Sequence, residues 1–233
     1  MLLQQIKVLS LDATNTLIRL KQPPGETYAN FARDFGFNQV DKNAISPLFL
    51  KAFKQLEKEK PCYGFYGAGS KSWWTDLMRS CYGDEIASSS KFPALADRVF
   101  DFYKTKEAWC LTDEKNLEFL RSLSAHNLKI AVVSNFDERL HDLLNLFGIS
   151  EFVSEVLLSA EVGFQKPESE MFQLLLNRFK ITDPKLCLHI GDNYEKDYLP
   201  AKALGMHAKI LGGNIPNVPS FDCIKSISGL NKI

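Results

Sequence analysis

Apolar residues recur along this chain in five short runs, and each run is long enough for one buried strand. The runs cover residues 6–12, 129–134, 155–159, 186–190 and 207–211. Continuous apolar stretches of about four to eight residues are typical of strands in the interior of a sheet. The pattern therefore predicts five strands at these positions.

The segments between the later runs have a helical period instead. Apolar side chains recur there at i, i+3, i+4 and i+7, which places them on one face of a helix. One set is Leu140, Leu143, Leu144 and Phe147, followed by Gly148, and another is Met171, Leu174, Leu175 and Phe179, preceded by Pro167. Glycine commonly ends a helix and proline suits its first turn, so we expect one helix over 136–147 and another that opens near Pro167.

Strands that alternate with helices of this length indicate an α/β fold, with a Rossmann-like parallel sheet and helices on both faces. In such sheets ligands bind outside the carboxyl ends of the strands. Asp12, Ser134 and Asp192 each stand where a predicted strand ends. We therefore expect these three side chains to meet at one edge of the sheet.

A different pattern covers residues 22–107, where β-branched runs are few. Helical runs lie there at 27–37, 43–58, 68–82 and 93–106, and the second has an apolar stripe of Ile45, Leu48, Phe49 and Phe53. The pattern predicts an α-helical cap domain over 22–107, inserted into an α/β core of residues 1–21 and 108–233. Such insertions are tolerated where their two ends lie close together. After Gly212, the residues predict a loop and a short terminal helix.

Charge and cysteine content narrow the function classes. The 28 basic residues balance the 28 acidic ones, so no basic field favours nucleic acid or a membrane surface as partner. No apolar run is long enough to span a bilayer, and the first residues lack the features of a signal peptide. The five cysteines are widely spaced without a Cys-x-x-Cys, which is typical of reduced thiols in a cytoplasmic protein. The oligomeric state is left open.

Asp12 is the first candidate for chemistry, because a carboxylate at the end of a buried strand is costly unless it binds or reacts with something. A carboxylate can attack a phosphorus centre and form an aspartyl-phosphate, whereas an Asp after a strand also commonly caps a helix. Ser134 and Asn135 can hold phosphate oxygens, or cap the helix that follows them.

Lys166, Asp192 and Asp197 are the remaining candidates. A fixed ammonium at Lys166 would offset the charge of a phosphoryl group, although most lysines lie in solvent. Asp192 and Asp197 could supply oxygen ligands to Mg²⁺. The simpler interpretation of Asp192 is a turn residue after Gly191, and that of Asp197 is an exposed charge on a helix.

Taken in order, four segments resemble the motifs of the haloacid dehalogenase-like hydrolase superfamily. They are Asp12-Ala13-Thr14-Asn15-Thr16-Leu17, Val132-Val133-Ser134-Asn135, Gly163-Phe164-Gln165-Lys166-Pro167 and Gly191-Asp192 with Asp197. Members of the superfamily mostly attack phosphate esters with an Asp nucleophile and Mg²⁺. The resemblance covers the whole chain, although Pro200 stands where the superfamily usually has Gly.

The resemblance implies a role for each matching residue. Asp12 would be the nucleophile and Lys166 a catalytic residue, and Ser134, Asn135 and Lys166 would bind the phosphate of a small phosphorylated molecule. Asp12, the main-chain carbonyl of Thr14 and Asp192 would hold Mg²⁺, with Asp197 as a further ligand or as a partner of the ligands. Segments around Trp73-Trp74, Ser134 and Gly191 resemble one group within the superfamily, which has no firmly assigned substrate.

Thr14 differs from the residue that phosphatases of the superfamily have at this position, and this difference limits how much activity can be inferred. Phosphatases of the superfamily carry an Asp at this position, which protonates the leaving group and then activates the attacking water. Acid–base help of this kind is worth roughly 10²–10⁴-fold, and threonine does not titrate near neutral pH. Asp137 and Glu195 are near in sequence, but nothing in the sequence places them at the water.

Three interpretations stay open. The chain could be a slow phosphatase for esters with good leaving groups or for acyl phosphates. It could form a long-lived phosphoenzyme, as in the transport-ATPase branch, which also has Thr at this position. It could also be a non-catalytic member that binds a ligand or a partner protein. A dehalogenase is less favoured, because that branch needs no Mg²⁺ and uses a cationic halide site that the sequence does not reveal.

An aromatic cluster in the predicted cap could choose the substrate. It comprises the segment 62–69 and the pair Trp73-Trp74. Aromatic side chains at helical positions more often pack a core, so we expect Trp73 and Trp74 to pack the helices. For 62–69, packing and lining of a cleft are equally favoured.

Overall fold

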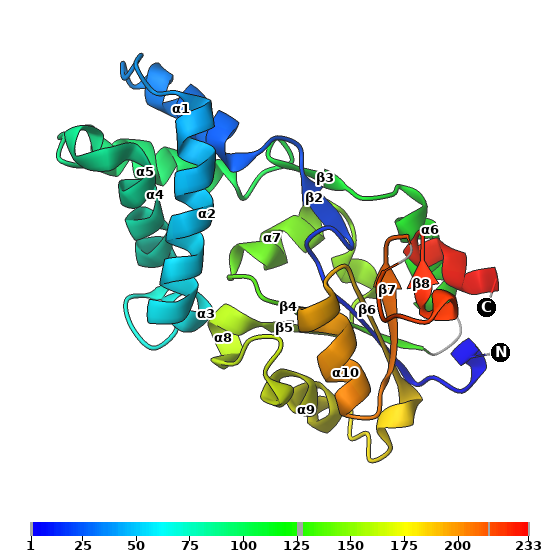
Figure 1. Ribbon diagram of the computed structural model, residues 1–233. Coiled ribbons are helices and arrows are strands. Elements are labelled where there is room, and N and C mark those ends of the chain that lie inside the picture. The colour runs from blue at the N-terminus through cyan, green and yellow to red at the C-terminus, as the bar shows by residue number, and fades with distance from the viewer. Residues whose placement is uncertain (1, 125–127, 214, 233) are drawn as a thin grey trace.

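Residues 2–124, 128–213 and 215–232 are described by the structure, a computed structural model, and they form a sheet part and a helical part (Figure 1). The main sheet has six parallel strands in the order β5-β4-β1-β6-β7-β8. These strands are β1 (Val8–Leu11), β4 (Lys129–Ser134), β5 (Glu155–Leu158), β6 (Cys187–Gly191), β7 (His207–Leu211) and β8 (Cys223–Ile224). The five strands predicted from apolar runs are therefore confirmed.

Three strands were not predicted, because each is too short to give a pattern. β8 has two residues, in the segment predicted to be a loop, and it pairs with β7 at the edge of the sheet. β2 (Ile18–Leu20) and β3 (Trp109–Leu111) form a separate antiparallel pair. The predicted terminal helix is a 3₁₀ helix over Ile227–Lys232.

Helices cover both faces of the main sheet, as predicted, and two apolar clusters hold them there. Leu9 and Leu11 of β1 face the cluster under α6 (Lys115–Ser124), α7 (Arg139–Leu146) and the terminal 3₁₀ helix. Val8 faces the opposite cluster, under α9 (Ser169–Arg178) and α10 (Leu199–Ala203). Successive side chains of a strand point to opposite faces, so one short apolar run serves two cores. The predicted α/β fold is confirmed.

Shorter helices connect these elements. They are α8 (Ser159–Val162), the π-helical turn Tyr194–Tyr198, and the 3₁₀ helices Leu2–Gln4, Ser150–Phe152, Pro184–Leu186 and Ser220–Asp222. Two predicted helices begin later than expected. α7 begins at Arg139 and not at 136, because the Asp137 carboxylate accepts a hydrogen bond from the backbone N–H of Arg139. α9 begins at Ser169, so Pro167 precedes it.

The helical part lies on the side of the sheet where the carboxyl ends of the strands are found (Figure 1). It comprises α1 (Pro24–Asp34), α2 (Lys42–Glu59), α3 (Pro61–Gly64), α4 (Gly69–Ala87) and α5 (Phe92–Phe102). These helices bury an apolar cluster of their own, centred on Tyr28, Trp73, Leu77 and Leu95. Ile45, Phe49 and Phe53 contribute to it, as the stripe predicted, but Leu48 does not, since it is 41% exposed on the outer side of α2.

The two connections to the helical part run side by side. β2 precedes α1 and β3 follows α5, and their pairing sets Leu20 opposite Trp109. The ends of the segment 22–107 are thereby held together, which is the arrangement that an inserted domain requires. The domain boundaries themselves stay a prediction.

Two predictions from composition can be placed on this fold. Within the described ranges, no helix is both long enough and apolar enough to cross a membrane. The five cysteines are free thiols, and Cys62, Cys81 and Cys187 among them are buried.

Candidate functional site

Asp12 directly follows β1, and the neighbouring strands hold it in place. Its backbone N–H donates to the Ile190 carbonyl at 2.9 Å, which continues the ladder between β1 and β6. The side chain is 6% exposed, and its Oδ1 accepts hydrogen bonds from the Ser134 hydroxyl at 3.0 Å and the Lys166 ammonium at 2.7 Å. Oδ2 has no hydrogen bond within the described part of the chain. Strand ends that are far apart in sequence thus meet at this carboxylate, as predicted.

Lys166 lies between two carboxylates, with 2% of its surface exposed. Its Nζ donates to Asp12 and to Asp197 Oδ1, the latter at 2.5 Å. Asn135 holds the backbone of this lysine on both sides: its amide donates to the Lys166 carbonyl at 2.8 Å, and its Oδ1 accepts from the Lys166 N–H at 2.7 Å. Asn135 therefore fixes where the ammonium enters the site.

Asp197 uses both carboxylate oxygens for hydrogen bonds within the protein. Oδ1 accepts from Lys166 and contacts His189 Nε2 at 3.1 Å, and Oδ2 accepts from the Asn193 N–H at 3.0 Å. The close approach depends on Gly191, where a Cβ atom would lie 2.2 Å from the Asp197 carboxyl carbon. His189 is fully buried and its Nδ1 is 2.8 Å from the hydroxyl of Ser10.

Asp12, Asp192 and Asp197 form an acidic cluster. One carboxylate oxygen of each lies within 4.8 Å of those of the others. Burial raises the pKa of Asp12, despite the nearby Lys166 ammonium, and burial together with the Asp197 carboxylate raises the pKa of Asp192. Burial also acts to raise the pKa of Asp197, but the charge of Lys166 and the contact with His189 lower it overall.

Charge and donor type make the cluster suitable for Mg²⁺. Three carboxylates face one ammonium, so the ionised cluster carries 3 − 1 = 2 uncompensated negative charges, which one divalent cation would neutralise. Mg²⁺ prefers carboxylate and carbonyl oxygens and keeps several waters. Asp12 and Asp192 have oxygens to offer, since Asp192 accepts a single side-chain hydrogen bond, from Asn15 at 3.1 Å. Asp197 is already engaged through both oxygens.

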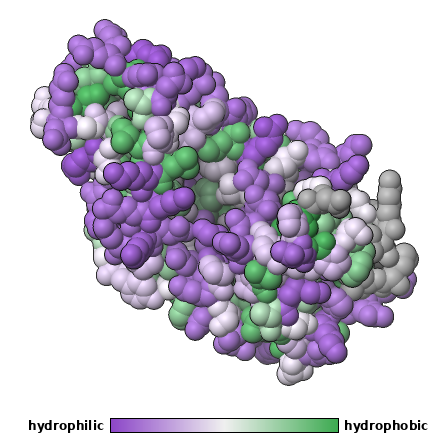
Figure 2. Space-filling view, viewed as in Figure 1, coloured by the Kyte–Doolittle hydropathy of each residue, from purple (hydrophilic) through white to green (hydrophobic). Residues whose placement is uncertain are grey.

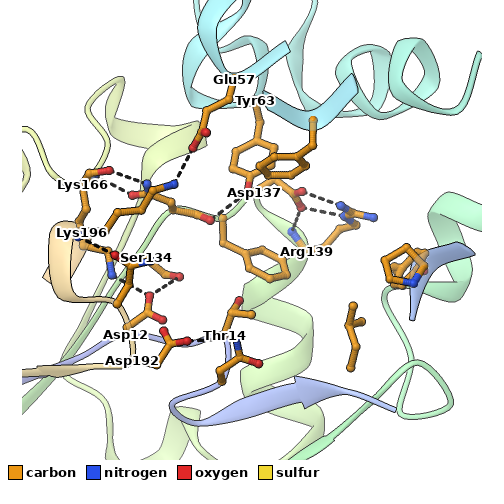
Figure 3. Close-up of a pocket in the computed structure, with 18 of the residues that line it drawn as sticks. Asp12, Thr14, Glu57, Tyr63, Ser134, Asp137, Arg139, Lys166, Asp192 and Lys196 are labelled. Atoms are coloured by element: carbon orange, nitrogen blue, oxygen red, sulfur yellow. Dashed lines mark hydrogen bonds and ion pairs between the residues drawn. The ribbon is translucent and has the colours of Figure 1, made fainter. Parts of the chain in front are cut away.

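A cavity of about 350 Å³ lies above the cluster, between the sheet part and the helical part. Figure 2 shows apolar residues gathered in the recess between the two parts. Thr14 lines the cavity together with Asp12, Ser134, Lys166 and Asp192 (Figure 3). The same lining includes Asn135 and Asp197. From the helical part it includes Tyr28, Phe49, Phe53, Glu57, Tyr63 and Trp74. All predicted site residues thus border one space, which both parts of the molecule line.

Contacts across this space were missed by sequence reasoning, and two of them involve Lys196 and Tyr63. The Lys196 ammonium lies 2.7 Å from the Glu57 carboxylate of α2. The Tyr63 hydroxyl donates to the Asn135 carbonyl at 2.9 Å, and Tyr63 adopts a left-handed backbone with φ +53°. No local signal predicts these contacts, although an unusual backbone of this kind is often found at functional sites.

Asp137 and Arg139 form a buried ion pair in the cavity wall. Their side chains are 0% and 4% exposed, and Arg139 Nη2 lies 2.6 Å from Asp137 Oδ2. The Trp74 indole N–H donates to the same oxygen at 2.7 Å. Asp137 is therefore engaged on both oxygens, while Glu195 is exposed and outside the cavity lining. Neither carboxylate is available as a replacement for the acid missing at Thr14.

The aromatic pair combines the two expected roles. Trp73 packs the helical core as predicted, with 2% exposure and its indole N–H donating to the Lys60 carbonyl at 2.9 Å. Trp74 packs against Tyr63, with ring centroids 5.8 Å apart, but it also lines the cavity. The predicted packing is therefore confirmed for Trp74 as well, and the same side chain also reaches the cavity, the alternative role considered for the aromatic cluster.

Comparison with known proteins agrees with this geometry. A family model described as "Hydrolase: haloacid dehalogenase-like hydrolase" matches residues 6–205. Haloacid dehalogenase-like hydrolase domain-containing protein 3 of Bos taurus is 33% identical over 218 residues, which cover 93% of this chain and 86% of that protein. The resemblance inferred from the motifs is thereby confirmed.

Two solved structures share the fold. One is the magnesium-bound orthorhombic form of the HAD-hydrolase YfnB from Bacillus subtilis, with a TM-score of 0.73, 17% identity and coverage of 97% of both chains. The other is 2-haloacid dehalogenase from Pseudomonas syringae pv. Tomato DC3000, with a TM-score of 0.67, 19% identity and the same coverage. At these identities the likeness concerns the fold alone. The family match and the relative's identity over most of its length decide the relationship: the chain belongs to the haloacid dehalogenase-like hydrolase family.

Proposed function

We propose that this protein is a slow, Mg²⁺-dependent hydrolase of small phosphate monoesters, with Asp12 as its nucleophile. The observation that supports this proposal most strongly is the surroundings of the Asp12 carboxylate, where a hydroxyl, an ammonium and two further carboxylates come together at one cavity. A nucleophile, a binding group for phosphate oxygens and a site for a divalent cation are the parts that phosphoryl transfer requires. The widely spaced free thiols support a cytoplasmic location.

The first step follows from the position of Asp12. A carboxylate oxygen forms a bond to phosphorus while the ester P–O bond breaks, and the bonding electrons leave with the ester oxygen. The Ser134 hydroxyl and the Lys166 ammonium, both within 3.0 Å of Asp12 Oδ1, can turn to the phosphoryl oxygens and hold them. Thr14 donates no proton, so the leaving oxygen must depart as an anion or take its proton from water.

The second step returns Asp12 to its free state. A water oxygen attacks phosphorus, the bond between phosphorus and the Asp12 oxygen breaks, and the water gives its proton to solvent. Without a carboxylate at Thr14 that could take this proton, the step loses some part of the roughly 10²–10⁴-fold supplied by general bases. We therefore expect the phosphorylated form of Asp12 to be long-lived.

Three groups would hold the metal: the carboxylates of Asp12 and Asp192 and the main-chain carbonyl of Thr14. When bound, Mg²⁺ supplies positive charge to the phosphoryl oxygens. Asp197 fits a supporting role better than a ligand role, because its oxygens already bind Lys166 and the Asn193 N–H. The structure of YfnB bound to magnesium, which shares this fold, supports the choice of metal.

Two other functions explain the site less well. A dehalogenase needs a cation for the departing halide, but Arg139 and Lys196 are each paired with a carboxylate. In this site the buried Lys166 ammonium lies 2.7 Å from one oxygen of Asp12, while the other oxygen of Asp12 is left for attack on a substrate. A protein that only binds a ligand would not need this arrangement.

Phosphate release from 4-nitrophenyl phosphate tests the proposal. We expect slow release that requires Mg²⁺ and falls to the background rate in Asp12→Asn. Asp34→Asn is the matched control, since Asp34 is an exposed carboxylate of α1 outside the cavity lining, and it should keep the full rate. Equal rates in Asp12→Asn and the control would refute the nucleophile assignment. No release from any phosphomonoester would favour the ligand-binding alternative.

A further inference from the structure

The cavity above Asp12 extends past the groups that would hold a phosphoryl group, and its part lined by Phe53, Tyr63 and Trp74 is called the far compartment below. At about 350 Å³ the whole space lies at the small end of ligand pockets, so it holds a phosphate and a leaving group of about one ring system. Asp12, Thr14 and Asp192 occupy one end, and Tyr63 and Arg139 lie away from that end (Figure 3). The walls of the far compartment therefore select the leaving group.

These walls are aromatic. Six rings from the helical part contribute to them: Tyr28, Phe49, Phe53, Tyr63, Trp74 and Tyr103. Tyr63 and Trp74 are stacked with their centroids 5.8 Å apart, and Phe49 and Phe53 with theirs 6.0 Å apart. Several rings are only partly buried although they belong to an apolar cluster, so part of their surface borders the empty space. An aromatic ring of a substrate in this compartment would make edge-to-face and stacked contacts with these side chains, as the side chains do with one another.

The same compartment offers no free charge. Three cationic side chains line the cavity within the described residues, and each is already neutralised: Lys166 by Asp12 and Asp197, Lys196 by Glu57, and Arg139 by Asp137. The Arg139 guanidinium also lies 4.8 Å from the centroid of Trp74. A second charged group on the substrate, of either sign, would be buried without a partner, which is costly, because the carboxylates Glu57 and Asp137 are also engaged in these pairs. The leaving group should therefore be uncharged.

Thr14 points to the same class independently. With no acid at this position, the ester oxygen must be stable as an anion, and aryl oxides meet this requirement far better than alkyl oxides. We infer that the substrate is the monophosphate of an uncharged phenol, with its ring held in the compartment of Phe53, Tyr63 and Trp74. This inference rests on the proposed function, whose Asp12 end holds the phosphate.

Binding of phosphonates tests the inference without turnover, because a P–C bond is not hydrolysed. Calorimetric titrations with saturating Mg²⁺ would compare benzylphosphonate, cyclohexylmethylphosphonate, methylphosphonate and 4-carboxybenzylphosphonate. Benzylphosphonate should bind most tightly, roughly 2- to 10-fold better than the equally large cyclohexyl compound. The added carboxylate should weaken binding. Equal or tighter binding of the cyclohexyl or the carboxylated compound would overturn the inference.

Two matched variants locate the effect. Phe53→Leu should lose most of the preference for the benzyl over the cyclohexyl compound, because it replaces a cavity ring by an aliphatic group. Phe37→Leu makes the same change in the helical part outside this cavity and should keep the preference. An unchanged preference in folded Phe53→Leu would place the ring elsewhere and contradict the assignment. The wild-type series decides the substrate class even if Phe53→Leu does not fold.

A kinetic comparison separates ring recognition from leaving-group acidity. Phenyl phosphate and hexafluoroisopropyl phosphate release alcohols of similar acidity, but only the first has a ring. A higher kcat/KM for phenyl phosphate supports the inference, and equal values contradict it while leaving the proposed hydrolase intact. If neither ester is hydrolysed and not even methylphosphonate binds with Mg²⁺, the proposed function fails, and the inference fails with it.

Discussion

Replacement of Lys166 by methionine tests the electrostatic design of the site most fully. The wild-type ammonium is 2% exposed and bridges Asp12 and Asp197 at 2.7 and 2.5 Å. Lys166→Met keeps the length of the side chain but leaves both buried carboxylates without a counter-charge. Removing one partner of a buried ion pair costs about 3–5 kcal/mol. For a chain of this size the cost corresponds to a decrease in Tm of about 6–20 °C.

The loss should depend on pH, with a sign that follows from the pKa shifts. In the wild type the pKa of Asp197 is lowered in the folded state, so its ionised form stabilises the fold above its unfolded pKa of about 3.9 and loses this effect as the pH falls. Without Lys166 the pKa values of Asp12 and Asp197 should both rise. Folding then favours the protonated forms, and the stability of the variant falls as the pH rises through these raised values. The destabilisation should be larger at pH 7.5 than at pH 5.

Thermal unfolding of wild type and Lys166→Met at both pH values, with metal removed by EDTA, measures this difference. Lys209→Met is the control, since Lys209 is 4% exposed and pairs with Asp222 at 2.9 Å, away from the cavity lining. It should lose stability but keep phosphate release per folded molecule, whereas Lys166→Met should lose both. A Lys166→Met protein that is as stable as wild type at pH 7.5 would show that the ammonium does not compensate these carboxylates.

Three further predictions follow from the same site. Asp192→Asn should weaken Mg²⁺ binding more than Asp197→Asn does. For Asp197→Asn we expect a loss of about 10-fold, because this residue orients the ligands and is not itself one. Equal Mg²⁺ affinities of the two variants in calorimetric titrations would reject this ligand assignment. Thr14→Asp should speed phosphate release by some part of the roughly 10²–10⁴-fold of general acid–base catalysis, and more for an alkyl than for an aryl phosphate at saturating Mg²⁺; a folded variant without any gain would mean that acid–base help is not what the chain lacks. Limited proteolysis should cut near the ends of 22–107 before it cuts the sheet strands, and the reverse order would argue against an inserted cap domain.

The sequence was most informative for elements whose local hydrophobic pattern is set by their position in the fold. Strands such as 129–134 are buried on both sides, so their apolar runs predicted both their position and the placement of Ser134 at their end. Lys166 could be assigned only through the resemblance to the family, because nothing local indicates that this lysine is buried. β2, β3 and β8 are too short for any period to be detected.

The part of the site that comes from the helical part was not predictable in this way. Glu57 and Trp74 lie on long helices whose periodicity shows which face is apolar but not which element that face meets. Their contacts with Lys196 and Asp137 depend on how the two parts of the chain dock. Tyr63 likewise contacts Asn135 because its backbone is left-handed, and the local sequence gives no indication of this conformation.

Formation of a phosphoenzyme at Asp12 is the most direct test of the whole account. The protein would be mixed with 4-nitrophenyl phosphate and Mg²⁺, quenched in acid, and weighed intact by mass spectrometry. An aryl leaving group needs no acid in the first step, while the second step lacks a base at Thr14, so the intermediate should accumulate. We expect a protein heavier by one phosphoryl group, which hydroxylamine removes and which Asp12→Asn does not form. An adduct of the same size in Asp12→Asn, or phosphate release by the wild type with no adduct at any time, would contradict the account.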